Sequence, residues 1–149
     1  MRGNILQSHF TLNLRVYIED TDAGGIVYYV NYLKFMERAR TEFLRSLGLG
    51  KAALFADELM FVVTALQSDY LASAGLDDEL SVSACVKRVG RSFVIFDQLI
   101  ERANDAPQLL CRGETKVACV SRETRKPVAM PRALREKLVA RIEPDNVDE

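Results

Sequence analysis

Histidine is nearly absent from this sequence, because His9 is the only one among its 149 residues. A Ser-His-Asp or Cys-His mechanism would depend on that one imidazole, and no Gly-x-Ser-x-Gly motif is present, which argues against both. One histidine and three scattered cysteines also make no zinc site. We expect neither a metal nor a cofactor. The cysteines lack Cys-x-x-Cys spacing and stand in apolar stretches, so we expect buried free thiols at Cys85, Cys111 and Cys119.

Nucleotide-binding and nucleic-acid-binding signatures are missing as well. No glycine-rich phosphate loop occurs in the chain. Asp20 and Asp22 precede glycines as in a calcium loop, but the third acidic ligand and the closing glutamate are absent. The net charge is -1 and basic residues do not alternate with aromatic ones, so we do not expect nucleic acid as a partner.

Long apolar runs are the third absence. No run approaches the roughly 20 residues that a membrane span requires. The segment from Met1 to His9 has no apolar core of the length found in signal peptides. We therefore expect a cytoplasmic protein without an integral membrane segment.

Periodic hydrophobicity is present throughout the chain and predicts one domain over residues 1–149, with a core at about 10–140 and an acidic tail. Alternation predicts a first strand over 10–18, with Ile18 on its buried face. A helical repeat predicts a helix over 31–47, with Asn31 as its N-cap and Gly48 as its stop. The apolar stripe of this helix consists of Tyr32, Met36, Ala39, Phe43 and Leu47.

The second half of the chain is dominated by strand patterns. Alternation predicts four strands, over 60–70, 80–87, 92–100 and 109–121, and Pro131 can open a short helix over 131–141. This order indicates an α+β protein in which a five-stranded antiparallel sheet packs against one central helix. The sheet edges and its open face can bind partner subunits. Arg40, at the edge of the helical stripe, either extends to solvent or pairs with a carboxylate.

An acidic loop between the first strand and the helix is the best candidate site. Asp22 lies two residues before the Gly24-Gly25 pair, which lets a backbone or ligand approach closely. The amides near the helix start, from about Tyr28 to Tyr32, favour developing negative charge. An acyl carbonyl bound there would be polarised, and the carboxylate could attack it or activate a water molecule. The alternative is a solvated turn that uses Asp and Gly for local hydrogen bonds.

The segment RVYIEDTDAGGIVYY, from Arg15 to Tyr29, together with 31–32 and 37–42, resembles the 4-hydroxybenzoyl-CoA thioesterase family of hot-dog-fold enzymes. The likeness is strongest to the acyl-CoA thioesterase branch associated with the bacterial Tol-Pal system, and it covers roughly residues 12–138. It implies a five-stranded sheet wrapped around one long helix. It also implies a homodimer, usually paired into a homotetramer, with active sites at the dimer interface.

The resemblance assigns roles to residues of the acidic loop. It implies that Asp22 is the catalytic carboxylate and that the backbone amide of Tyr29 polarises the thioester carbonyl. Gly24, Gly25 and Asn31 are expected to contact substrate, and Asp20 is expected to hydrogen-bond the loop. Whether Asp22 acts as nucleophile or general base stays open.

Tyr29 departs from the branch pattern, because many members of the Tol-Pal-associated branch have histidine there. The hydroxybenzoyl-CoA enzyme resembles this chain in having tyrosine. The backbone amide role is compatible with tyrosine at position 29. A role for an imidazole in positioning or proton transfer is not. Another hot-dog branch uses a glutamate on the helix, which makes Glu37 a reserve candidate, but we favour a surface or interface ion pair for it.

Basic residues gather between 112 and 137, where eight cations outnumber three acids, and again around Gly90. Coenzyme A phosphates require such cations, and an acidic acyl-carrier protein could bind the same surface. The residues that we select for phosphate contacts are Arg91, Arg125 and Lys126.

Two functions follow as hypotheses. The first is an acyl-CoA thioesterase that releases a free acid and coenzyme A, with short aliphatic acyl groups expected first and aromatic ones second. The second is a non-catalytic module that binds acyl-CoA or acyl-carrier protein, such as a scaffold in lipid metabolism. A purely structural dimerising domain would leave the acidic loop without a use.

Overall fold

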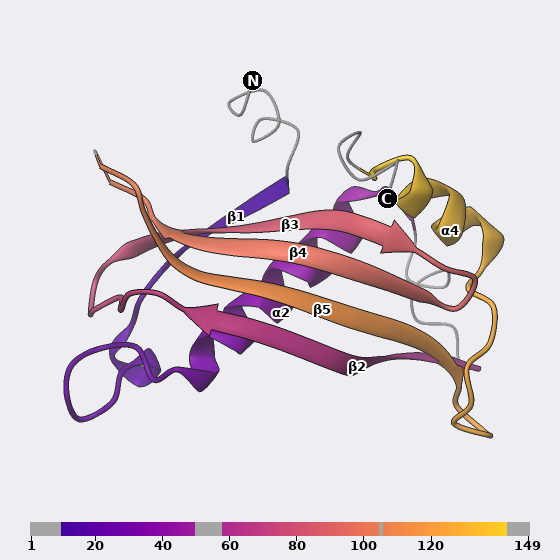
Figure 1. Cartoon of the computed structure of the whole chain (residues 1–149), viewed down its shortest axis with the longest axis horizontal. Coiled ribbons are helices and arrows are strands. Elements are labelled where there is room, and N and C mark those ends of the chain that lie inside the picture. Colours follow the sequence, from indigo (N-terminus) through magenta and orange to yellow (C-terminus); the bar gives the residue numbers. More distant parts are fainter. Residues whose placement is uncertain (1–9, 50–57, 105, 143–149) are drawn as a thin grey trace. The chain divides into compact units, whose positions relative to one another are not determined.

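The computed structural model describes residues 10–49, 58–104 and 106–142. A five-stranded antiparallel sheet has the strand order β1-β3-β4-β5-β2, and one long helix accompanies it (Figure 1). The predicted hot-dog architecture is therefore confirmed. The strands are β1 (Phe10–Arg15), β2 (Leu59–Tyr70), β3 (Glu79–Val89), β4 (Phe93–Arg102) and β5 (Gln108–Ser121), and the helices are η1 (Ile18–Asp20), α2 (Val30–Ser46) and α4 (Arg132–Val139).

The chain forms two compact units. The first unit comprises the described residues of Met1–Phe43, Ser68–Ala84 and Gln98–Gly113. The second unit comprises those of Leu44–Gln67, Cys85–Asp97 and Glu114–Glu149.

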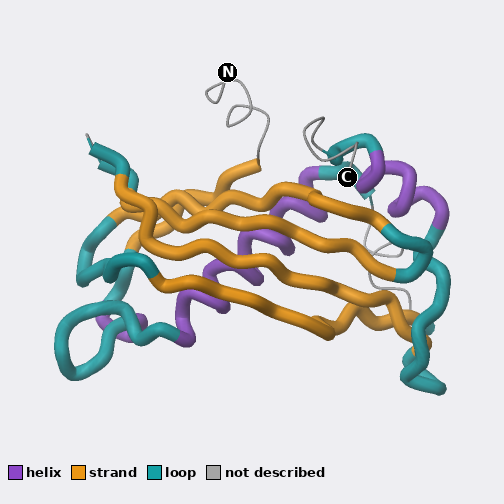
Figure 2. The backbone as a smooth tube through the Cα atoms, in the orientation of Figure 1, coloured by secondary structure: helices purple, strands orange, loops and turns teal. Residues whose placement is uncertain are grey.

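In the first unit, α2 lies against one face of the strands (Figure 2). Its apolar stripe is buried as predicted, with Phe35 and Met36 fully inaccessible to solvent. The Nε2 group of Gln98 in β4 donates hydrogen bonds of 3.0 Å to the carbonyls of Met36 and Ser83, and its Oε1 accepts one from Arg40. These bonds satisfy a side chain that is only 1% exposed.

In the second unit, a turn at Gly90 joins β3 to β4. The ring of Phe93 occupies the space where a Cβ at position 90 would lie, since its nearest ring atom is only 2.2 Å from that point. Lys116 Nζ stands 4.5 Å from the centre of the same ring. Helix α4 follows and buries Leu134 and Leu138.

The predicted bounds of the long helix agree with the structure to within one residue, but the predicted N-cap does not. Helix α2 begins at Val30, so Asn31 lies inside it and its Nδ2 donates to the carbonyl of Asp20 at 2.8 Å. Gly48 ends the helix with a φ of +79°, as predicted. Pro131 is the N-cap of α4 rather than its first residue, and that helix ends at Val139 instead of residue 141.

The first strand is shorter than predicted. It ends at Arg15, and Ile18 in η1 is 75% exposed instead of buried. The reason is local, because the Asp20 side chain accepts a hydrogen bond from the Tyr17 N–H and so favours a turn over a continued strand. His9 and the acidic tail at 143–149 lie outside the described residues.

Candidate active site

Backbone hydrogen bonds close the acidic loop into a tight turn within the first unit. The Asp22 N–H donates to the carbonyl of Ile26 at 2.9 Å, and the Gly25 N–H donates to that of Asp22 at 3.0 Å. A bridge between Thr21 and Val27 joins the two arms of the turn. The loop is therefore an ordered element that holds the exposed Asp22 in one place.

Each glycine of the pair has a distinct role in this turn. Gly25 has a φ of +84°, a conformation that side chains disfavour. A Cβ on Gly24 would lie 3.3 Å from Oδ1 of Asp22. That oxygen accepts the Gly24 N–H at 2.8 Å, so the bare backbone of Gly24 both orients the carboxylate and leaves it room.

Asp20 has a structural role, as expected. It is 9% exposed, and its Oδ2 accepts the Tyr17 N–H at 2.9 Å. Its carbonyl accepts hydrogen bonds from the Tyr28 N–H at 3.0 Å and from the Asn31 side chain. Asp20 thus connects the acidic loop to the start of α2, while Asp22 stays exposed.

The first amides of α2 provide hydrogen-bond donors. The N–H groups of Asn31 and Tyr32 donate to the carbonyls of Tyr28 and Tyr29. Within residues 10–49, 58–104 and 106–142, the Tyr29 N–H donates to no protein acceptor. A donor of this kind at the positive end of a helix favours an oxygen that gains negative charge.

Aromatic rings surround this helix start. Tyr29 packs edge-on against Tyr28 at 5.2 Å and against Tyr70 at 5.8 Å, measured between ring centres. Tyr32 links Tyr70 to Phe35. Tyr29 is 57% exposed and Tyr70 is 43% exposed, so two phenol rings in contact with each other are accessible to solvent at the helix start. This cluster was not predicted from the sequence, although the three-residue spacing of Tyr29, Tyr32 and Phe35 was a signal for it.

A segment between β2 and β3, residues 73–78, backs the acidic loop. The Val27 N–H donates to the carbonyl of Ala74 at 2.9 Å, and Ile26 forms a bridge with Gly75. The Ala74 N–H in turn donates to the hydroxyl of Tyr32. Nothing in the local sequence predicted this pairing.

The three predicted phosphate-binding cations are all exposed and all belong to the second unit. Arg125 and Lys126 lie together in the turn after β5, where the Ser121 N–H donates to the Lys126 carbonyl. Arg125 has a φ of +63°, which is uncommon for a residue with a side chain. The Arg91 carbonyl accepts the Met130 N–H.

The chain also offers other groups that a site could use. All three cysteines are free and buried, as predicted, and burial raises the pKa of the Cys111 and Cys119 thiols. A raised pKa lowers the thiolate fraction, which makes them poor nucleophiles.

Among the described residues, no group of three or more His, Cys, Asp or Glu side chains could hold a metal ion. No helix in that part of the chain is long and apolar enough to cross a membrane.

A five-stranded antiparallel sheet with one long helix, and a carboxylate loop at the start of that helix, defines the hot-dog class of proteins. A model of the thioesterase-like superfamily matches residues 16–138, and the chain belongs to this superfamily. An acyl-CoA thioesterase named YbgC from Haemophilus influenzae is 42% identical over 132 residues, which cover 88% of this chain and 95% of the relative.

Solved structures agree with this assignment. A 1,4-dihydroxy-2-naphthoyl-CoA thioesterase from Synechocystis has a TM-score of 0.80 and 25% identity, covering 95% of this chain and 98% of its own. A 4-hydroxybenzoyl-CoA thioesterase mutant complexed with 4-hydroxybenzoyl-CoA has a TM-score of 0.79 at 18% identity, covers 88% of this chain and 99% of its own, and shows the shared fold. The predicted family resemblance is confirmed, while the Tol-Pal association stays a prediction.

Proposed function

We propose that the protein hydrolyses acyl-CoA thioesters to a free acid and coenzyme A. The observation that carries this proposal is that one loop-and-helix element holds an exposed, oriented Asp22 carboxylate and, at the start of α2, a Tyr29 amide that donates to no acceptor among the described residues. The first group can attack or deprotonate, and the second can stabilise a developing oxyanion. The names of relatives such as the YbgC acyl-CoA thioesterases support the same reaction.

Two routes are open to this pair of groups. In one, the Asp22 carboxylate attacks the thioester carbon, coenzyme A leaves as a thiolate that takes up a proton, and water then hydrolyses the mixed anhydride. In the other, Asp22 removes a proton from a water molecule that attacks the carbon directly, the C–S bond breaks, and the coenzyme A thiolate leaves and takes up a proton. In both, the carbonyl oxygen accepts the Tyr29 N–H as it gains charge. Gly24 and Gly25 give the acyl group access, and Asn31 fixes the loop against the helix start.

The acyl group and its carrier are finer parts of the proposal. Short aliphatic acyl-CoAs are the first expectation, and the exposed rings of Tyr29 and Tyr70 favour aromatic acyl groups as the second. Arg91, Arg125 and Lys126 would bind the phosphates of coenzyme A. An acyl-carrier protein would be attracted to the same cations.

We further propose that the chain works as one domain in a homodimer or homotetramer in the cytoplasm. A sheet covered on one face by a single helix leaves surface for partner subunits. Three cysteines that form no disulfide in the described part of the chain suit a reducing compartment.

Release of free thiol from a panel of acyl-CoAs, compared for the native protein and Asp22→Asn, tests the function. Asparagine keeps an acceptor for the Gly24 N–H but loses the charge, so the fold should persist while the rate falls by at least about 10². Glu37→Gln, on the exposed face of α2, tests the reserve candidate by the same loss of charge and should retain the native rate if Asp22 is the catalytic carboxylate. Equal rates for Asp22→Asn and the native protein would refute the assignment.

The non-catalytic alternative makes a different prediction. A binding module would retain acyl-CoA in calorimetry with no thiol released across all chain lengths. Its affinity would be the same with Asn at position 22, because no step would require the carboxylate.

A further inference from the structure

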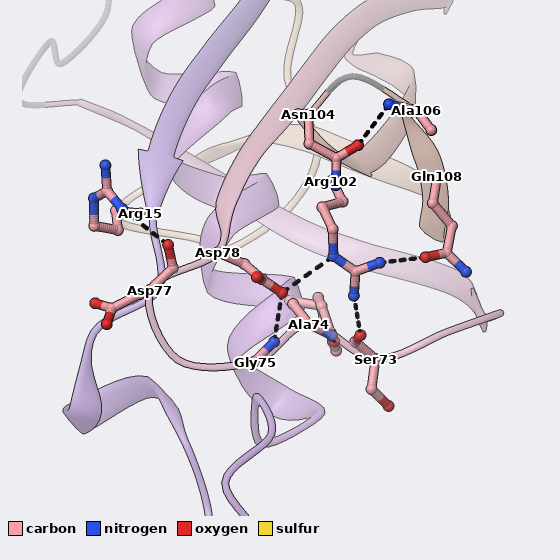
Figure 3. A network of polar contacts seen from close by, with 11 residues as sticks. Arg15, Ser73, Ala74, Gly75, Asp77, Asp78, Arg102, Asn104, Ala106 and Gln108 are labelled. Carbon is pink, nitrogen blue, oxygen red and sulfur yellow. Dashed lines mark hydrogen bonds and ion pairs between the residues drawn. The ribbon is translucent and has the colours of Figure 1, made fainter.

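The backing segment 73–78 lies between the acidic loop and a partly buried arginine, Arg102, in the first unit. On one side, it pairs with the loop through Ala74 and Gly75. On the other side, it contacts Arg102, the last residue of β4 (Figure 3). The position of the acidic loop therefore depends on the contacts that hold residues 73–78 in place.

Arg102 holds the segment at several points at once. Its Nε forms an ion pair of 3.1 Å with Oδ2 of Asp78, its Nη2 donates to the carbonyl of Ser73 at 2.6 Å, and its Nη1 donates to Oε1 of Gln108 in β5. Oδ2 of Asp78 also accepts the Gly75 N–H at 2.8 Å. Figure 3 shows the Arg102 guanidinium pointing into the space between Ser73, Asp78 and Gln108.

The chemistry of this contact is specific to arginine. The side chains of Arg102 and Asp78 are 23% and 30% exposed, so solvent screens their attraction less than it would on the open surface. A planar guanidinium presents donors in fixed directions, which suits three acceptors divided between the backing segment and β5. A lysine could keep the charge but not all three bonds.

We propose that Arg102 and Asp78 are positioning residues for the reaction, an inference that rests on the proposed function. They fix Ala74 and Gly75, these pair with Ile26 and Val27, and that pairing sets the distance between the Asp22 carboxylate and the Tyr29 amide. The loop keeps its own internal bonds without them, so their loss should loosen the site rather than unfold it. Small displacements of reacting groups lower rates steeply, about 10²-fold for roughly 1 Å.

Arg15 provides a matched control on the same segment. It donates to the carbonyl of Asp77 at 2.9 Å and forms an ion pair of 3.4 Å with Glu79. Among the described residues, it forms no hydrogen bond or ion pair with Ala74 or Gly75, which pair with the loop. An effect that comes only from weakening the segment or removing a charge would appear in Arg15→Met as well.

The kinetic test uses Arg102→Met, Arg102→Lys, Asp78→Asn and Arg15→Met in the full chain. We expect kcat to fall by roughly 10-fold to 100-fold in Arg102→Met and Asp78→Asn with KM nearly constant. Arg102→Lys should recover part of the loss, and Arg15→Met should retain the native kcat. In an Asp22→Asn background, Arg102→Met should add almost no further loss, because its effect passes through Asp22. Additive losses, or an equal loss in Arg15→Met, would overturn the proposal.

A second measurement does not depend on catalysis. Hydrogen exchange of the Val27 and Tyr28 amides should become faster in Arg102→Met and Arg102→Lys, but not in Arg15→Met. If the native protein hydrolyses no thioester, the proposed function fails while this exchange result still reports on loop positioning. Unchanged exchange in both Arg102 variants would refute the positioning role even in an active enzyme.

Discussion

The hydroxyl of Tyr32 accepts a hydrogen bond from the backbone N–H of Ala74 at 2.9 Å, although 42 residues separate them in the chain. Both residues are buried, with exposures of 3% and 0%. One side chain of α2 is thereby bonded to the segment that backs the acidic loop. The helix start and the loop are coupled through this bond.

Removal of that hydroxyl should destabilise the fold. In Tyr32→Phe the Ala74 N–H loses its acceptor in a dry environment, at a cost of about 1–3 kcal/mol. Urea unfolding followed by circular dichroism measures the change. Tyr17→Phe, at a position 62% exposed, should leave the unfolding midpoint at its native value. A Tyr32→Phe protein as stable as the native one would show that water replaces the lost acceptor.

Alkaline pH should weaken the fold through the same residue. Burial raises the pKa of the Tyr32 phenol above its ordinary value of about 10. Above that pH the unfolded chain releases the proton while the folded phenol retains it, so stability falls as pH rises. Tyr32→Phe lacks this proton, so the difference in unfolding free energy between the two proteins should shrink between about pH 8 and about pH 11. The buried thiols titrate in both proteins and cancel in the comparison. A constant or growing difference would contradict the assignment.

The two loop glycines should separate stability from activity. Gly25→Ala forces a side chain into positive φ and should cost about 1–2 kcal/mol, with little change in kcat for the folded fraction. Gly24→Ala places a Cβ against Oδ1 of Asp22 and should lower kcat by roughly 10-fold with a small effect on stability. Thermal unfolding and thiol release on the same samples test both. The reverse pattern would mean that Gly24 does not set the carboxylate position.

Tyr29 should act through its backbone. Tyr29→Pro removes an N–H that bonds to no acceptor in the described part of the chain, and proline is tolerated at the start of a helix. We expect a folded protein whose kcat falls by about 10² or more, as when an oxyanion donor is lost. Tyr29→Ala removes the ring but keeps the N–H, so its kcat should stay within about 10-fold of the native value. Similar losses in both variants would assign the role to the phenol instead.

The fold was largely predictable because its periodicities are local. The helical stripe from Tyr32 to Leu47 is buried as the spacing required, and Leu80, Val82, Ala84 and Val86 face the core. Errors arose where side chains compete with the backbone, as Asp20 does at the end of β1. The Gln98 amide, 58 residues away, was also missed as a partner of Arg40.

The candidate site was predictable only in part. Asp22, Gly24 and Gly25 are neighbours in sequence, so their composition and spacing indicate a loop that can hold a carboxylate. Their support comes from residues 73–78 and from Arg102, which belong to other elements. Contacts of that separation depend on how strands are ordered in the sheet, and no local pattern encodes them.

The buried amide of Gln98 limits the insertions and deletions that the chain can accept near the start of α2. It bonds to Met36 and Arg40, which are one helical turn apart, and so it fixes both the rotation and the axial position of α2. Insertion or deletion of a residue between Tyr29 and Met36 would rotate the helix start by about 100° and move it by about 1.5 Å. The number of residues between Tyr29 and Met36 is therefore constrained by the hydrogen bonds of one buried side chain of β4.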